Sequence, residues 1–286
     1  MNKKILLSGL FIVFYIFAIA QVSNPINLYL TPSISDEALK ESGSVIEQFL
    51  EKETGLPIDL KIPKTYEVLI ENFGSDKRCF AFMSSQSYVV ANGKYKASVK
   101  LRIVRFGHSV YQGMIVAHES SGIKTLRDLQ GKTMAYTDEL STSGYLYPKM
   151  MLKKNKVTPS NEVYLQKHDE VIKQVYEKKV DAGAAFYSEA GNGSLRDARS
   201  RLKEKYPDVE KKVVIIAKTD PIPNDPLVFS KDFDAAHANK ICMALIKLAK
   251  DEKGKQALLQ LYGAEGFVKA SDADYNTLRQ VVKANK

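Results

Sequence analysis

The chain has 286 residues, of which 44% are hydrophobic and 26% are charged, and its formal net charge is +9. This composition is that of a globular protein without low-complexity tracts, and the length is sufficient for two lobes. The positive charge favours an anionic ligand only weakly. The absence of Trp and of basic patches interleaved with aromatic residues argues against a nucleic-acid-binding protein.

The N-terminus has the pattern of a secretory signal peptide. Lys3 and Lys4 form a basic start, an apolar run covers residues 5–19, and Ala18 and Ala20 form an A-x-A cleavage site. A membrane-spanning helix needs about 20 apolar residues, and this run is shorter. No cysteine follows it, which argues against lipid modification. We therefore expect cleavage after Ala20 and a periplasmic or otherwise extracytoplasmic protein, with an uncleaved membrane anchor as the alternative.

Strands and helices alternate in the next part of the chain. Alternating apolar residues predict strands, and apolar residues at helical spacing predict helices. The predicted strands cover 26–30, 58–62 and 78–83, and the predicted helices cover 36–54 and 66–73. This alternation favours an α/β fold with a mainly parallel sheet and helices on both faces.

Two long extended runs, 99–104 and 111–116, interrupt this alternation. A short helix follows, with Thr125 as its N-cap and Gly131 as its C-cap. A second series then has predicted helices at 144–154 and 168–178 and strands at 162–165, 182–186 and 212–217. The end of the chain is predicted to be helical at 235–250, 253–262 and 273–284.

The two alternating series predict two lobes between which the chain crosses twice. The expected crossings lie near residues 108–111 and 220–227. Residues 21–109 and 224–286 then form the first lobe, and residues 110–223 form the second. A ligand is expected between the lobes, where strand ends and helix N-termini meet.

Three consecutive hydroxyl residues, Ser141, Thr142 and Ser143, stand between a predicted strand at 132–136 and the predicted helix at 144–154. The first N–H groups of a helix have no partner inside it, and the helix dipole adds about half a positive charge there. Such a site binds phosphate-like groups without a lysine. Gly144 lets a ligand approach the backbone closely, and Pro148 removes one N–H from the first turn. The alternative is ordinary helix capping, for which one of the hydroxyls suffices.

Segment 141–148, Ser-Thr-Ser-Gly-Tyr-Leu-Tyr-Pro, resembles the ligand-binding turn of the phosphate, phosphite and phosphonate substrate-binding proteins of ABC importers. Segments 123–132, 180–184 and 219–227 resemble the same family in the same order, and the resemblance extends over about residues 26–281. It implies a two-lobed periplasmic-binding-protein fold of type II, with two mixed sheets joined by two hinge crossings. It also implies an exported protein, not an enzyme, that captures a small phosphorus oxyanion and delivers it to an ABC permease. We further expect a monomer without cofactor or metal.

The resemblance assigns ligand contacts to individual residues. The three hydroxyl residues match the oxyanion cradle, and Gly144 belongs to the same turn. His168 matches a histidine that reaches the same oxyanion, and Tyr66 and Tyr111 match aromatic residues that close over the ligand. Asp225 matches an acidic residue that accepts a hydrogen bond from a protonated ligand oxygen or pairs with a ligand amine. Helix capping is the alternative for the histidine, and core packing is the alternative for the tyrosines.

One position departs from the aminoalkylphosphonate binders of that family. Those proteins carry an acidic residue, which holds the ligand ammonium, a few positions after the strand that follows Asp181. In this chain Ser188 falls at that register, with Glu189 beside it. We keep all three as further candidate contacts. A ligand without an amine, such as phosphite, phosphate or a small alkylphosphonate, is favoured at least as much as one with an amine.

Two other functions are alternatives to transport. The chain lacks the motifs of a phosphoester hydrolase. His118-Glu119 has no second histidine at metal-ligand spacing, and Leu126 stands where a phosphate loop needs Gly. There is also no G-x-S-x-G segment, since Ser141 replaces its first glycine two residues before Ser143. A binding subunit that feeds a sensor or signalling partner has the same ligand chemistry, so the sequence leaves it open.

Overall fold

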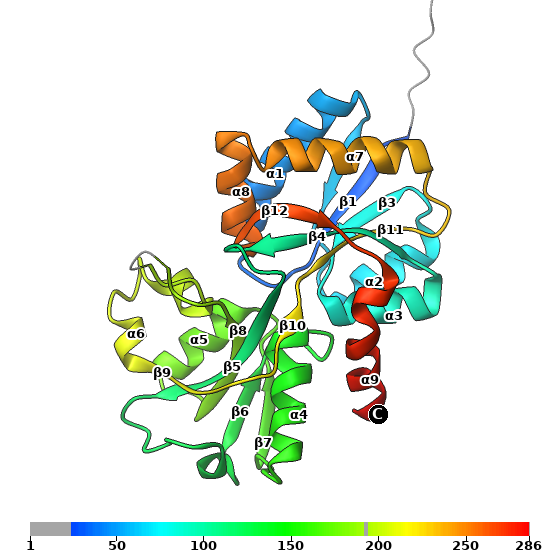
Figure 1. Cartoon of the computed structure of the whole chain (residues 1–286). Helices are drawn as coiled ribbons and strands as arrows, with labels where there is room; N and C mark the ends of the chain where they lie inside the picture. Colours follow the sequence, from blue (N-terminus) through cyan, green and yellow to red (C-terminus); the bar gives the residue numbers. More distant parts are fainter. Residues whose placement is uncertain (1–23, 192–193, 286) are drawn as a thin grey trace, which may run out of the picture.

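Figure 1 shows the computed structural model, which describes residues 24–191 and 194–285. In these residues the chain forms two mixed β-sheets, each flanked by helices. We call each sheet with its helices a lobe. The expected signal peptide, residues 1–20, lies outside the described residues.

The first lobe is built on a six-stranded sheet with the order β12-β4-β11-β3-β1-β2. Strand β1 pairs in parallel with β2 and β3, whereas β11 and β12 are antiparallel to their neighbours. The strands are β1 (Ile26–Leu30), β2 (Ile58–Lys61), β3 (Cys79–Phe82), β4 (Ser98–Arg105), β11 (Pro226–Phe229) and β12 (Ala264–Lys269). The helices are α1 (Asp36–Thr54), α2 (Tyr66–Ser75), α3 (Ser85–Tyr95), α7 (Ala235–Leu248) and α8 (Glu252–Tyr262).

The core of the first lobe lies on both faces of its sheet. Successive side chains of a strand point to opposite faces. Ile26, Leu28 and Leu30 of β1 therefore pack in one cluster with apolar residues of α1, α7 and α8. Tyr29 points the other way and packs with apolar residues of α2 and α3. The sheet is thus covered on both sides, as the helix–strand alternation predicts.

The second lobe is built around β5, which pairs antiparallel with β8, β9 and β10. Strand β6 is parallel to both β7 and β8. The strands are β5 (Val110–His118), β6 (Thr133–Tyr136), β7 (Asn161–Tyr164), β8 (Ala182–Tyr187), β9 (Val213–Lys218) and β10 (Ile222–Pro223). The α-helices are α4 (Tyr147–Lys154), α5 (His168–Tyr176) and α6 (Val209–Lys212), and short 3₁₀ turns cover Leu126–Leu129 and Ala198–Leu202.

Two segments join the lobes, one between β4 and β5 and the other between β10 and β11. Asn224 holds the two segments together, because its buried side-chain amide donates to the carbonyl of Ile103 at 3.0 Å and to that of His108 at 2.7 Å. We propose that this pair of segments is the hinge, with residues 21–109 and 224–286 on one side and 110–223 on the other.

Three local expectations are corrected. Helix α3 was not predicted, because its sequence, Ser-Gln-Ser-Tyr-Val-Val-Ala-Asn-Gly-Lys-Tyr, lacks a clear apolar stripe. The predicted helix after Thr125 is a single 3₁₀ turn with a Thr125–Asp128 capping box. The helix expected from residue 144 begins instead as a π-helical turn, Thr142–Leu146, before α4 starts at Tyr147.

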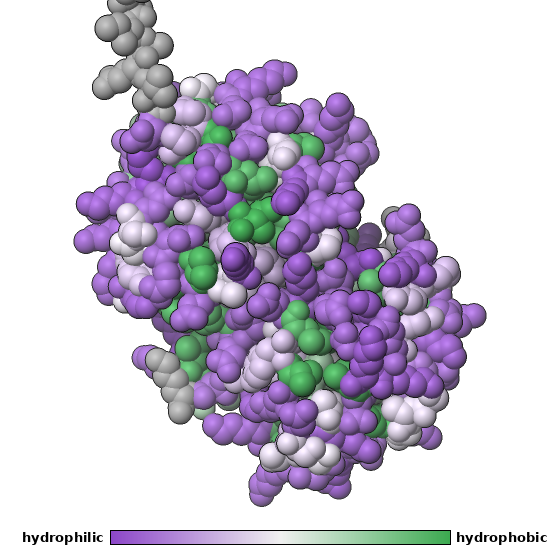
Figure 2. Space-filling view, turned by 180° about the vertical axis from the view of Figure 1, so that it is seen from behind, coloured by the Kyte–Doolittle hydropathy of each residue, from purple (hydrophilic) through white to green (hydrophobic). Residues whose placement is uncertain are grey.

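The chain ends with a 3₁₀ turn, Asp272–Tyr275, and helix α9, Asn276–Ala284. This helix extends from the first lobe toward α4 of the second (Figure 1), where Lys153 donates to the carbonyl of Ala284 at 3.4 Å. Hydrophilic residues cover most of the face seen in Figure 2, and apolar residues appear there in small groups. Within the described part of the chain, every helix is too short or too polar to span a bilayer.

Candidate ligand-binding site between the lobes

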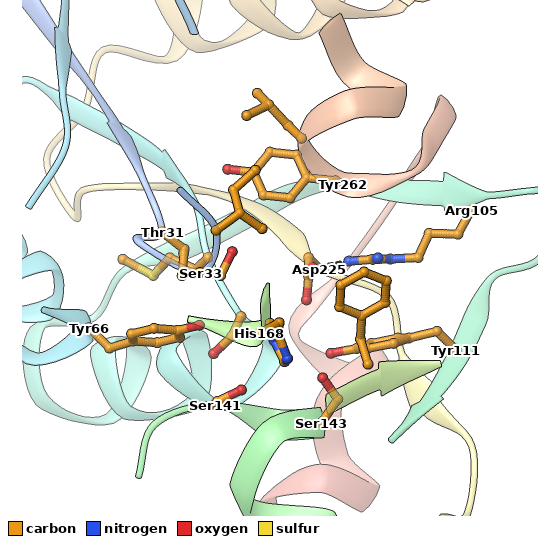
Figure 3. A pocket seen from close by; sticks show the side chains of 15 residues that line it. Thr31, Ser33, Tyr66, Arg105, Tyr111, Ser141, Ser143, His168, Asp225 and Tyr262 are labelled. Carbon is orange, nitrogen blue, oxygen red and sulfur yellow. Dashed lines mark hydrogen bonds and ion pairs between the residues drawn. The ribbon is translucent and has the colours of Figure 1, made fainter. Parts of the chain in front are cut away.

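A small cavity of about 40 Å³ lies where the two lobes meet (Figure 3). One water molecule needs about 10–15 Å³ in this measure, so the cavity has room for a ligand of a few non-hydrogen atoms. The first lobe and the crossing supply polar lining from Thr31, Ser33, Tyr66, Ser84, Arg105, Tyr111, Asp225 and Tyr262. The second lobe supplies Ser141, Ser143 and His168.

The serine turn (Ser141–Gly144) forms the second lobe's wall of the cavity. It follows β6, and the N–H of Gly144 donates to Ser141 Oγ at 3.1 Å. Ser141 therefore caps the helical turn, as the alternative of ordinary helix capping predicts. The same hydroxyl still carries a proton that it can donate to a ligand. The turn is π-helical, a conformation that often occurs at functional sites. Capping and ligand binding are therefore compatible at Ser141.

Two residues of the turn lie behind the cavity wall. Thr142 is fully buried, and its Oγ1 accepts the N–H of Gln86 from the first lobe at 2.9 Å. Gly144 has Thr137 Oγ1 only 2.0 Å from the place where a Cβ would stand. Neither Thr142 nor Gly144 is part of the cavity lining. The structure thus gives Gly144 a packing reason for having no side chain, in place of the close ligand approach that the sequence suggested.

His168 enters the cavity from the first residue of α5. It is 5% exposed, and burial lowers its pKa from 6.5 to about 3, with Arg105 and Arg201 adding to the effect. The ring is therefore neutral at pH 7, and its Nδ1 has no protein partner. Its backbone N–H donates to the carbonyl of Ser33 in the first lobe at 3.0 Å. The side chain can thus donate one hydrogen bond to a ligand without adding a charge.

Three tyrosines line the cavity on the side of the first lobe and the crossing. Tyr66 begins α2, Tyr111 lies in β5, and Tyr262 ends α8. Burial raises the pKa of all three phenols far above 10, so they stay protonated. The hydroxyl groups of Tyr66 and Tyr111 point toward the centre of the cavity in Figure 3. Both are buried as core packing would require, and both also face the space that a ligand would fill.

Asp225 places a carboxylate in the cavity next to Arg105. Its Oδ2 accepts from Arg105 Nη2 at 2.5 Å, whereas its Oδ1 is buried without a protein partner. Burial raises the pKa of the Asp225 carboxyl above its ordinary value, and the guanidinium opposes this rise. The free oxygen points toward the cavity (Figure 3). It needs a hydrogen-bond donor, and a bound ligand can supply one.

The sequence reasoning missed several lining residues, and Arg105 is the most important of them. Buried residues alternate with more exposed ones along β4, and Val99, Leu101, Ile103 and Arg105 are the buried positions. This period of two could have revealed an arginine directed inward. Thr31 and Ser33, in the loop after β1, had no comparable signal, because hydroxyl residues are common in loops.

The further candidate contacts, Asp181, Ser188 and Glu189, lie outside this cavity. Asp181 precedes β8, which is parallel to β6, so it stands at the opposite end of the sheet from the serine turn. Its carboxylate accepts the N–H of Thr133 at 2.8 Å. Ser188 and Glu189 follow β8 and line a separate pocket of about 320 Å³, which shares Arg105 and Tyr111 with the cavity. Among the described residues, no cluster of three or more potential protein ligands for a metal occurs.

Contacts across the cavity hold the lobes together in this conformation. Ser84 donates to the carbonyl of Leu140 at 2.8 Å, and the side chain of Gln86 donates to that of Glu139 at 2.8 Å. On the outer edge, Lys167 pairs with Asp36 at 2.9 Å. Because both lobes contribute to the lining and to these bonds, the structure represents a closed form.

The chain is similar to known proteins over most of its length. Residues 28–275 match the family model described as the periplasmic substrate-binding protein of the phosphonate ABC transporter. The phosphonates-binding periplasmic protein of Escherichia coli is 25% identical over an alignment that covers 100% of this chain and 88% of that protein. The phosphate-import protein PhnD of Mycolicibacterium smegmatis is also 25% identical, with 90% of this chain and 84% of that protein covered.

Solved structures share the fold. A binding-protein component of an ABC phosphonate transporter from Pseudomonas aeruginosa superposes with a TM-score of 0.80 at 22% identity, covering 91% of this chain and 86% of that one. A Prochlorococcus marinus protein in complex with methylphosphonate gives a TM-score of 0.78 at 18% identity, covering 91% and 98%. The expected type II periplasmic-binding-protein fold, with two mixed sheets and flanking helices, is confirmed.

Proposed function

The chain belongs to the family of periplasmic substrate-binding proteins of ABC phosphonate transporters, and we propose that it captures a small phosphorus oxyanion between its lobes. The observation that carries the proposal is the closed cavity of about 40 Å³, in which neutral donors of the second lobe face a carboxylate of the first. Phosphite, phosphate and methylphosphonate have the required size and charge. The proposed ligand is therefore a phosphonate, phosphite or phosphate.

The proposed binding mode assigns a task to each lobe. Ser141, Ser143 and His168 donate to the unprotonated oxygens of the ligand, and the helical turn adds its unpaired N–H groups. Tyr66 and Tyr111 close over the ligand and exclude water, which strengthens every hydrogen bond to the anion. Asp225 Oδ1 accepts from a protonated ligand oxygen. This arrangement binds an oxyanion without a dedicated cation at its centre.

Ligand binding and lobe closure are coupled in this proposal. The ligand contacts both lobes only when they are shut, so it favours the closed form. An ABC permease in the membrane then recognises that form and receives the ligand. We propose export to the periplasm or an equivalent compartment, a monomeric state, and no role for nucleic acid, cofactor or metal. The relatives are transport proteins, and we propose that this chain likewise catalyses no reaction.

Isothermal titration calorimetry with phosphite, phosphate and methylphosphonate tests the proposal directly. We expect at least one of them to bind with a stoichiometry of one ligand per chain and to raise the melting temperature. Sulfate and acetate are the controls for non-specific anion binding. If none of the three phosphorus compounds gives heat or a thermal shift above those controls, the proposed function is wrong. Turnover of a chromogenic phosphate ester would contradict the non-enzymatic part.

A further inference from the structure

Arg105 is fixed at the edge of the cavity by the turn that leaves β4. The N–H of Arg105 donates to the carbonyl of His108 at 3.0 Å, and the N–H of His108 donates back at 2.8 Å. The two residues between them, Phe106 and Gly107, have φ angles of 47° and 79°. Two successive positive φ values are typical of a tight two-residue hairpin turn. The turn therefore gives Arg105 a defined backbone position at the first crossing.

The side chain of Arg105 is held by aromatic packing and by an ion pair. It is 7% exposed, and its guanidinium carbon lies 4.6 Å from the ring centre of Tyr111 and 5.8 Å from that of Phe186. Its Nη2 donates to Asp225 at 2.5 Å. Figure 3 shows the guanidinium group beside the Asp225 carboxylate and above the ring of Tyr111. Arginine suits such a stacked ion pair because its charge is planar and delocalised.

The pair changes the electrostatics that a ligand meets. Among the described residues that line the cavity, Arg105 and Asp225 form the one ion pair, with Nη2 and Oδ2 2.5 Å apart, whereas His168 is neutral and the tyrosines are protonated. Their charges cancel. A carboxylate without Arg105 would attract a ligand ammonium group, whereas the paired carboxylate already has its cation. A second cation would meet the guanidinium as a like charge.

The neighbouring pocket strengthens this effect. It contains Ser188 and Glu189, and it shares Arg105 and Tyr111 with the cavity. These two shared residues therefore form the partition between the oxyanion cavity and Glu189. An ammonium group that extended from the phosphorus toward this carboxylate would have to pass the guanidinium. The position of Arg105 thus opposes an amine at both carboxylates.

We propose that Arg105 is a specificity-determining residue, which excludes amine-bearing phosphonates by occupying Asp225 and by standing between the cavity and Glu189. The ligands are then amine-free phosphorus oxyanions that present a protonated oxygen to Asp225 Oδ1, such as phosphate, phosphite or methylphosphonate. This inference rests on the proposed function, because it names the ligand class of the same cavity.

The test uses two ligands that differ in charge and hardly in size, aminomethylphosphonate and ethylphosphonate. Calorimetric titration of the unmodified protein is expected to give aminomethylphosphonate an affinity at least about 10-fold below that of ethylphosphonate. Equal or tighter binding of aminomethylphosphonate overturns the inference. Rejection of both ligands, with methylphosphonate still bound, also overturns it, because the size of the cavity would then set the specificity.

Variants locate the effect at Arg105. In Arg105→Met, the affinity of aminomethylphosphonate relative to ethylphosphonate is expected to rise about 10- to 100-fold, since Asp225 is then free for the ammonium group. Arg196→Met is the matched control, because Arg196 lies over Phe106 at 4.3 Å and lines only the neighbouring pocket. An unchanged ratio in Arg105→Met, or an equal change in Arg196→Met, contradicts the assignment.

The outcomes separate this inference from the proposed function. If the unmodified protein binds none of phosphate, phosphite and methylphosphonate, the proposed function fails. If it binds one of them and also binds aminomethylphosphonate as tightly as ethylphosphonate, only the role of Arg105 fails. Should Arg105→Met not fold, the double variant Arg105→Met/Asp225→Asn removes both charges of the pair, and its ratio is expected to approach one.

Discussion

The two lobes contribute different chemistry to the same cavity. The second lobe presents neutral donors, the hydroxyl groups of Ser141 and Ser143 and the uncharged ring of His168. The first lobe presents the charged pair of Arg105 and Asp225. The neutral side comes from residues adjacent in sequence and one helix start. The charged side is assembled from the last residue of β4 and the residue before β11, which lie 120 residues apart in the chain.

This difference explains how the cavity can combine affinity with selectivity. Neutral donors bind any small oxyanion, because they respond to its negative oxygens and require nothing else of it. The charged pair responds to what the ligand carries in addition, namely a proton on oxygen or a cationic group. In our proposal the second lobe therefore supplies affinity and the first lobe supplies discrimination.

Removing the donors of the second lobe is expected to have the largest effect. Ser141→Ala combined with Ser143→Ala deletes two hydrogen bonds to a charged ligand, each worth about 1.5–3 kcal/mol. Binding of the preferred oxyanion should weaken about 1000-fold in calorimetric titrations. Ser120→Ala and Ser121→Ala, which alter hydroxyls near His118 in the second lobe, form the control. A loss below tenfold would show that the serine turn does not hold the ligand.

A substitution at Asp225 in the first lobe should instead alter the discrimination between phosphate and sulfate. Sulfate has no proton to donate to Asp225 Oδ1, so we expect the unmodified protein to prefer phosphate over sulfate by about 100-fold. Asp225→Asn offers an amide donor and should bring this ratio close to one. Asp181→Asn is the control, since its carboxylate accepts the N–H of Thr133 outside the cavity. Phosphate and sulfate affinities that are already similar in the unmodified protein would contradict the proposal.

His168 of the second lobe and Asp225 of the first should make stability depend on pH in opposite directions. His168 has its pKa lowered from 6.5 to about 3, so the unfolded chain gains a proton before the folded one does. Stability is therefore lost as the pH falls from 6.5 toward 3, by up to about 1.4 kcal/mol per unit. Asp225, whose pKa is raised, acts in the opposite direction.

Urea unfolding without ligand at several pH values checks this sign. The difference in unfolding free energy between the unmodified protein and His168→Leu should grow less favourable to the unmodified protein as the pH falls below 6.5. His237→Leu serves as the control, because His237 is partly exposed at the start of α7. A difference that stays constant from neutral to acidic pH would mean that His168 is not buried in the neutral form.

The smallest effect is expected for the ion pair at the outer edge of the closed lobes. Lys167 and Asp36 lie 2.9 Å apart, with side chains 29% and 63% exposed. Exposed pairs contribute about 0–1 kcal/mol, so Asp36→Asn should weaken ligand binding less than about fivefold. The difference should vanish at high salt. A larger effect that is independent of salt would assign this edge a part in closure beyond simple charge attraction.

The sequence predicted the parts of the site that depend on local order. The serine turn is recognisable because three hydroxyls stand together after a strand, whereas His168 is assigned by the resemblance to a family together with its place at a helix start. Tyr66, Tyr111 and Asp225 required the resemblance to a family, since a single tyrosine or aspartate carries no local signal. Thr142 and Gly144 are among the expected ligand contacts; in the structure the Thr142 hydroxyl accepts the N–H of Gln86, and a side chain at Gly144 would collide with Thr137.

By itself, the sequence determined the α/β class, the order of most helices and strands, and the position of the three-hydroxyl turn between a strand and a helix. These follow from the periods of apolar residues and from residues adjacent in the chain, which act over one helical turn or one strand. Tertiary structure alone decided that Arg105 meets Asp225, and that Asp181 and Glu189 lie away from the cavity. Such meetings depend on strand pairing and lobe closure, and no local pattern encodes which distant side chains they bring together.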